Sequence, residues 1–158
     1  MTRLLKILLP LIILPSGTFA QGDTSQIDWV SYEKAITLAQ NHNQKVLLFM
    51  EADWCSVCKR MKREVFPDKE IKTLMNDHFL PVRIDIESED KILFQGREIS
   101  KKNLAKDLGI YGTPTIIFLE ENESVIGNNV GFMNTDNFKR LLTFIYQEEY
   151  LHSNFDNN

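Results

Sequence analysis

The chain has 158 residues, of which 43% are hydrophobic and 25% are charged, and its formal charge at pH 7 is −4. This composition excludes a disordered or low-complexity protein, and the length fits one domain. The net negative charge also disfavours a nucleic-acid-binding protein, for which a basic surface is expected. The only two cysteines, Cys55 and Cys58, lie three positions apart, which excludes a scaffold held by several disulfides.

Residues 1–20 have the three parts of a secretory signal. A basic start is followed by an apolar run to Leu14 and by small residues that lead to Ala20, the expected last residue removed. A membrane anchor is the alternative, but a spanning helix needs about 20 apolar residues, and Pro10 and Pro15 interrupt this run. We therefore predict a periplasmic or secreted protein, in a compartment where thiols tend to be oxidised.

The rest of the chain divides into a flexible lead-in at 21–28, one globular domain at 29–151 and a polar, frayed tail at 152–158. Two sequence patterns predict the first helix and the first strand of the domain. Apolar residues with the spacing of one helix face predict a helix from an N-cap at Ser31 to about residue 42. The continuous apolar run at 46–50 is typical of a central strand covered on both faces.

The later elements are predicted from helix-capping residues, from alternation of apolar and polar residues in strands, and from residues that break helices. The next helix begins at Cys55 and is broken at Pro67. Residues 87–99 are interpreted as a polar connection. The other expected elements are a helix capped by Asp68, a strand at 80–86, a helix capped by Ser100 and closed by Gly109, a hairpin of strands at 115–119 and 124–130, and a last helix capped by Thr135 or Asp136. This order predicts an α/β sheet with helices on both faces.

The Cys-x-x-Cys sequence lies between the buried strand and the start of a helix. Unpaired backbone N–H groups and the helix dipole at that end would stabilise a thiolate at Cys55, the predicted nucleophile. Cys58 falls one turn along the same helix face, within disulfide reach, and is the predicted buried, resolving thiol. We therefore predict a redox-active disulfide.

Two other interpretations of the cysteines are weaker. A disulfide that closes four residues stabilises by about 1.9 kcal/mol through loop entropy, against about 4.7 kcal/mol for a 100-residue loop, which disfavours a purely structural bridge. Zinc needs four ligands, and His42, His78 and His152 show no paired ligand spacing. We expect no metal and no other cofactor.

Pro114 stands directly before an apolar strand, where a proline marks the strand entry, and an X-Pro bond adopts the cis form at low cost. With Thr113-Pro114-Thr115 in this position, the run Trp54-Cys55-Ser56-Val57-Cys58-Lys59 resembles the thioredoxin superfamily over about residues 29–150. Exported bacterial members are similar at further positions, among them SoxW-like proteins and the C-terminal domain of the DsbD electron transporter. The resemblance implies a thioredoxin fold, a mixed central β-sheet flanked by helices on both faces.

The resemblance also implies roles for five residues. Cys55 would attack the client disulfide and Cys58 would resolve the mixed disulfide. Pro114 would be a cis-proline that faces the disulfide, and Thr113 would offer its backbone to a substrate strand. Trp54 would be the aromatic neighbour that covers the site.

One position departs from the resemblance. Thioredoxin and the DsbD domain carry a buried aspartate six residues before the first cysteine, which helps to deprotonate the resolving thiol, and this chain has Phe49 there. Glu51 or Asp53 is the candidate substitute for this proton relay.

These observations predict an exported thiol-disulfide oxidoreductase that reduces protein disulfides. The two residues between the cysteines include no histidine, which favours a reduction potential nearer that of thioredoxin, about −270 mV, than that of DsbA, about −120 mV. The resemblance implies re-reduction by a membrane electron donor of the DsbD or CcdA type. Two alternatives stay open, a disulfide oxidase or isomerase of the same fold and a binding or chaperone module with an inert disulfide.

Overall fold

The computed structural model describes residues 26–155. The predicted signal at 1–20 and most of the predicted lead-in lie outside the described residues. Within 26–155, none of the helices combines the length and apolar character that crossing a membrane requires.

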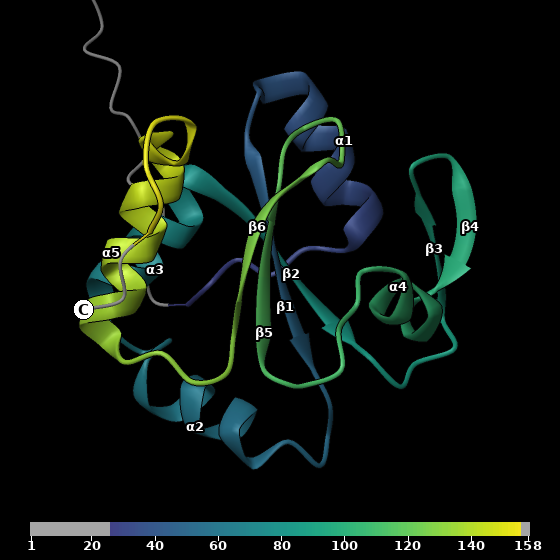
Figure 1. Cartoon of the computed structure of the whole chain (residues 1–158), viewed down its shortest axis with the longest axis horizontal. Coiled ribbons are helices and arrows are strands. Elements are labelled where there is room, and N and C mark those ends of the chain that lie inside the picture. The colour runs from purple at the N-terminus through teal and green to yellow at the C-terminus, as the bar shows by residue number, and fades with distance from the viewer. Residues whose placement is uncertain (1–25, 156–158) are drawn as a thin grey trace, which may run out of the picture.

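A four-stranded mixed sheet forms the centre of the domain (Figure 1). Its strands are β1 (Lys45–Glu51), β2 (Phe79–Asp85), β5 (Thr115–Leu119) and β6 (Val125–Val130). They lie in the order β2-β1-β5-β6, with β1 parallel to β2 and antiparallel to β5, and with β5 antiparallel to β6. The mixed sheet of the predicted fold is therefore confirmed.

Helices cover both faces of this sheet, and one lies at its end (Figure 1). They are α1 (Tyr32–His42), α2 (Ser56–Glu64), α3 (Lys69–His78), α4 (Lys101–Asp107) and α5 (Thr135–Tyr146), followed by a 3-10 turn at Glu149–Leu151. Buried residues of α1 and α4 form one hydrophobic core with the sheet, and those of α2, α3 and α5 form another.

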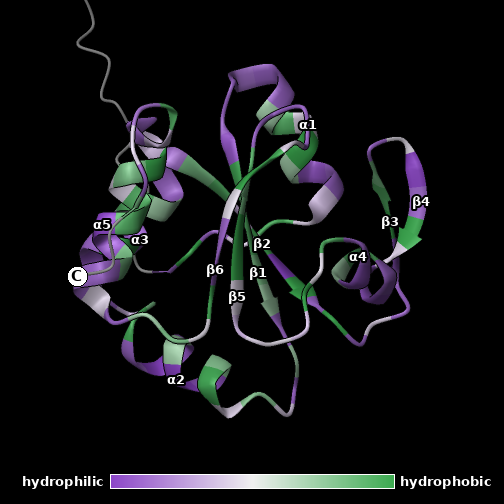
Figure 2. Cartoon of the chain, in the orientation of Figure 1, coloured by the Kyte–Doolittle hydropathy of each residue, from purple (hydrophilic) through white to green (hydrophobic). Residues whose placement is uncertain are grey.

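The side chains of β1 alternate between these two cores. Leu47 and Phe49 enter the core with α2, α3 and α5, whereas Val46, Leu48 and Met50 enter the core with α1 and α4. All five are fully buried, which confirms the expected central strand covered on both faces. Figure 2 shows the result as apolar central strands flanked by helices that carry both hydrophobic and hydrophilic residues.

Side-chain caps fix where the helices begin. The predicted caps of α1, α3 and α4 each accept a backbone hydrogen bond, namely Ser31, Asp68 and Ser100. The predicted caps of α5, Thr135 or Asp136, are wrong by one and two residues, because the helix begins at Thr135 and Asn134 caps it. The Asn134 side-chain oxygen accepts the Asn137 N–H at 2.9 Å, and asparagine is among the preferred N-cap residues.

The polar connection expected at 87–99 is wrong, because this segment forms a separate β-hairpin. Strands β3 (Lys91–Phe94) and β4 (Arg97–Ser100) pair antiparallel on either side of Gln95 and Gly96, whose φ values are 47° and 74°. Positive φ at both turn residues suits a two-residue hairpin turn. Strand β3 alternates exposed and buried residues, but over only four positions, too few to distinguish from a loop.

A buried carboxylate holds this hairpin to the rest of the domain. Glu123, in the turn between β5 and β6, accepts hydrogen bonds from the Tyr32 hydroxyl at 2.6 Å and from the Gln95 N–H at 3.1 Å. Burial and this hydrogen bond hold the pKa of Tyr32 well above its ordinary range, so the hydroxyl remains a donor. One side chain thus joins α1, the β3–β4 turn and the β5–β6 turn.

Replacing Glu123 with alanine is expected to lower the free energy of unfolding by about 1–3 kcal/mol, because the buried Tyr32 hydroxyl and the partly buried Gln95 N–H lose their acceptor. Urea denaturation measures this change. Adding Tyr32→Phe removes one of the stranded donors and should recover part of the loss. An alanine variant as stable as the wild type would show that Glu123 does not anchor the hairpin.

Candidate active site

The register of the sheet brings two distant segments to one end of the domain. Met50, near the end of β1, pairs with Thr115 at the start of β5. The chain that leaves β1 toward Cys55 and the chain that enters β5 through Pro114 therefore lie at the same end of two neighbouring strands. Helix α2 lies at this end as well (Figure 1).

Cys55 and Cys58 form a disulfide with an S–S distance of 2.06 Å and a Cα–Cα distance of 5.3 Å. Cys55 is the N-cap of α2, and its Sγ accepts the backbone N–H of Cys58 at 3.0 Å. The helix therefore begins at Ser56, one residue after the predicted start. Cys58 is fully buried and Cys55 is 3% exposed. A thiolate at Cys55 would meet the same N–H donor and the positive end of the helix dipole.

The Thr113–Pro114 peptide bond is cis. The Pro114 carbonyl accepts the N–H of Gly131 at 2.8 Å, and the Thr115 hydroxyl donates to the Gly112 carbonyl at 2.8 Å. The buried Thr113 hydroxyl has no hydrogen-bond partner in the part of the chain that the structure describes. The segment is therefore fixed on both sides of Thr113, while the polar side chain between these anchors is unpaired.

Large apolar side chains are exposed in the segments that carry the site. Trp54 is 62% exposed beside Cys55, Val57 is 37% exposed between the cysteines, and Tyr111 is 91% exposed in the chain leading to Pro114. Trp54 was predicted as a site residue from the sequence, whereas Val57 and Tyr111 were not. The signal for Tyr111 was an aromatic residue in a glycine-flanked loop, where a packed core position is not expected.

Residues 32–146 match the family model described as a thioredoxin-like domain. The chain belongs to this family. The fold is accordingly a thioredoxin fold, and the Cys55–Cys58 pair is the Cys-x-x-Cys disulfide of a thiol-disulfide interchange family, which supports a redox activity at this general level.

Relatives of this thioredoxin-like chain include two proteins named "Thiol:disulfide interchange protein DsbD". That of Yersinia enterocolitica is 30% identical over 64% of this chain and 16% of its own length, and that of Pectobacterium atrosepticum is 30% identical over 79% and 21%. The chain thus spans about a fifth or less of these relatives.

Solved structures show the same fold at lower identity. A thioredoxin from Thermus thermophilus has a TM-score of 0.63 at 22% identity, with 84% of this chain and 99% of that chain covered. The oxidised C-terminal domain of DsbD from Neisseria meningitidis has a TM-score of 0.55 at 20% identity, with 70% and 89% covered.

Phe49 and the two residues proposed for a proton relay, Glu51 and Asp53, lie in different surroundings. Phe49 packs against the ring of Phe66, with ring centroids 5.0 Å apart, so this position of the thioredoxin-like domain supports the site by packing alone. The Glu51 carboxylate is 13% exposed and binds the Lys62 ammonium group. Asp53 is exposed. Within the described residues, no hydrogen bond connects either carboxylate to the cysteines.

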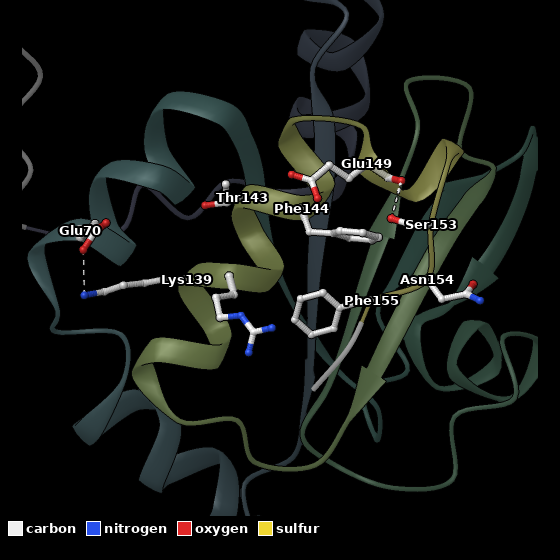
Figure 3. Close-up of a pocket in the computed structure, with 9 residues that line it drawn as sticks. Glu70, Lys139, Thr143, Phe144, Glu149, Ser153, Asn154 and Phe155 are labelled. Carbon is white, nitrogen blue, oxygen red and sulfur yellow. Dashed lines mark hydrogen bonds and ion pairs between the residues drawn. The ribbon is translucent and has the colours of Figure 1, made fainter. Parts of the chain in front are cut away.

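A pocket of about 480 Å³ lies away from the disulfide, between α3, α5 and the C-terminal tail (Figure 3). Its lining includes Lys139, which pairs with Glu70 at 2.9 Å, and Phe155, whose ring packs against Phe144 at 5.3 Å. None of the predicted site residues lines it. Within residues 26–155, no group of three or more potential ligands is placed to hold a metal ion.

Proposed function

We propose that the chain is an exported protein-disulfide reductase. The observation that carries this proposal is the Cys55–Cys58 pair at the N-terminus of α2, at the same end of the sheet as the Thr113–Pro114 segment. Export rests on the signal-like sequence of residues 1–20.

The reaction exchanges one disulfide for another. The Cys55 thiolate of the reduced protein attacks one sulfur of the client disulfide, and the other client sulfur leaves as a thiolate that takes up a proton. Cys58, once deprotonated, then attacks the Sγ of Cys55, which forms the Cys55–Cys58 disulfide and releases the first client sulfur, also protonated. Two electrons and two protons pass from the protein to the client.

The surroundings of the disulfide support a protein client. Trp54 and Tyr111 offer exposed aromatic surface in the segments around the cysteine and the proline, and such residues are enriched where proteins bind each other. The Thr113–Pro114 segment lies at the same end of the sheet as the cysteines, where an extended client chain would approach. A membrane dithiol donor of the DsbD or CcdA type would restore the reduced form, a proposal supported by the similarity to DsbD.

The reduction potential of the Cys55–Cys58 couple tests the direction of electron flow. Because Ser56 and Val57 supply no imidazole to hold a thiolate unusually stable, we expect a potential below about −220 mV in equilibrium with a dithiothreitol series. A value between about −120 and −180 mV would instead indicate an oxidase or isomerase. The absence of a reversible couple would exclude both and leave a binding module with an inert disulfide.

A further inference from the structure

A stacked pair joins the disulfide helix to the loop that follows β6. The guanidinium carbon of Arg60, on α2, lies 3.9 Å from the centre of the Phe132 ring. This distance is well inside the range of a cation–π contact, and a planar guanidinium also stacks on an aromatic face. The Arg60 Nε also donates to Glu64, one turn along the helix, at 2.8 Å.

Phe132 continues this connection to the proline segment. It directly follows Gly131, whose N–H donates to the Pro114 carbonyl at 2.8 Å. Gly131 has a φ of 91°, a backbone conformation that favours glycine. The stack and the hydrogen bond therefore form one bridge from the helix that carries the cysteines to the segment that contains Pro114.

Besides this stack, the ion pair between Lys62 and Glu51 and two buried side chains hold helix α2. Of its nine residues, only Cys58 and Met61 are buried. Arg60 lies one helical turn beyond Ser56 and Val57, the two residues between the cysteines. The Arg60 contact therefore restrains α2 close to the disulfide. It does so on the exposed side of the helix, away from the side that packs into the hydrophobic core.

We propose that Arg60 is a positioning residue, which by stacking on Phe132 fixes the disulfide relative to the Pro114 segment. The inference rests on the proposed function. A protein client has to fit the cysteine and the Pro114 segment together, whereas a small disulfide needs only the cysteine. Arg60 should therefore favour protein disulfides over small ones.

Steady-state kinetics with two substrates tests the proposal. For Arg60→Ala we expect kcat/KM for the reduction of insulin to fall about three- to fivefold, the factor that corresponds to an exposed cation–π contact, mainly through KM. The rate with oxidised glutathione should stay unchanged. Phe132→Leu should have the same effect, and the double variant should be no worse than either single one, because both changes remove one contact.

Two matched variants separate stacking from charge. Glu64→Gln removes the ion pair and leaves the stack, so it should behave as the wild type. Arg60→Lys keeps a positive charge but lacks the planar group, and it should retain most of the defect. Full activity of Arg60→Lys, or an equal loss on both substrates in Arg60→Ala, would overturn the positioning role while leaving the reductase intact. A wild-type protein inactive on both substrates would overturn the proposed function and this inference with it.

Amide hydrogen exchange of the oxidised protein gives a readout that does not depend on activity. The amides of α2 should exchange faster in Arg60→Ala than in Glu64→Gln, because only the first variant releases the helix. Equal exchange in the two variants would contradict the bridge.

Discussion

Replacing Cys58 with serine is expected to stop turnover and to accumulate a covalent complex between Cys55 and the client. Cys55 is the residue at the helix N-terminus whose Sγ meets a backbone donor, whereas Cys58 is fully buried. Without Cys58 the second exchange has no nucleophile, so the mixed disulfide persists. Non-reducing electrophoresis followed by mass spectrometry detects the complex and identifies the linked cysteine.

Cys55→Ser is the matched control for this experiment. It should also abolish turnover, but it should trap little or no client, because the remaining thiol is fully buried and lies within α2 rather than at its N-cap. Equal trapping by the two variants would mean that the roles of attacking and resolving cysteine are assigned wrongly. Loss of the complex on treatment with a reductant confirms that the link is a disulfide.

Replacing Phe49 with alanine is expected to lower the free energy of unfolding by about 3–5 kcal/mol, the usual cost of truncating a buried phenylalanine. The Phe49 ring is fully buried and packs against Phe66 and Trp29, with centroids 5.0 and 6.2 Å away. Guanidinium denaturation of the oxidised protein measures the change. Because Phe66 closely follows α2, the variant should also loosen the support beneath the disulfide helix.

An exposed position supplies the comparison for Phe49. Leu93 is 57% exposed on the β3–β4 hairpin, and Leu93→Ala should change the free energy of unfolding by no more than about 0.5 kcal/mol. If Phe49→Ala were equally mild, the aromatic contacts would not support the site.

Local patterns predicted most of the framework. The continuous apolar run at 46–50 identified a strand buried on both faces, because only such a strand needs no polar side. Ser31, Asp68 and Ser100 marked three helix starts, since a cap satisfies backbone donors within its own turn. These features depend on neighbours in the sequence, so they are visible without a structure.

The features that sequence reasoning missed depend on partners far away in the chain. Glu123 is a buried carboxylate only because Tyr32 and Gln95 converge on it from other elements. Arg60 lies in a charged stretch of sequence that is typical of a solvated helix face. Nothing in the adjacent sequence indicates that it stacks on Phe132. The family resemblance implied that the proline segment lies near the cysteines. In the structure, the pairing register of β1 and β5 is what brings the two segments to the same end of the sheet.

The register of β1 and β5 also determines how the redox pair responds to substitutions and insertions in the adjoining chain. The Pro114 side is fixed by the β1–β5 ladder, and along the chain the cysteine side is joined to the same ladder by residues 52–54, between the end of β1 at Glu51 and Cys55. These residues act as a spacer. Substitutions of the exposed Asp53 or Trp54 alter surface chemistry, but one added residue would shift the sulfur by about 3.5 Å with every strand still paired. The number of residues in the spacer is therefore under a stricter constraint than the identity of its two exposed residues.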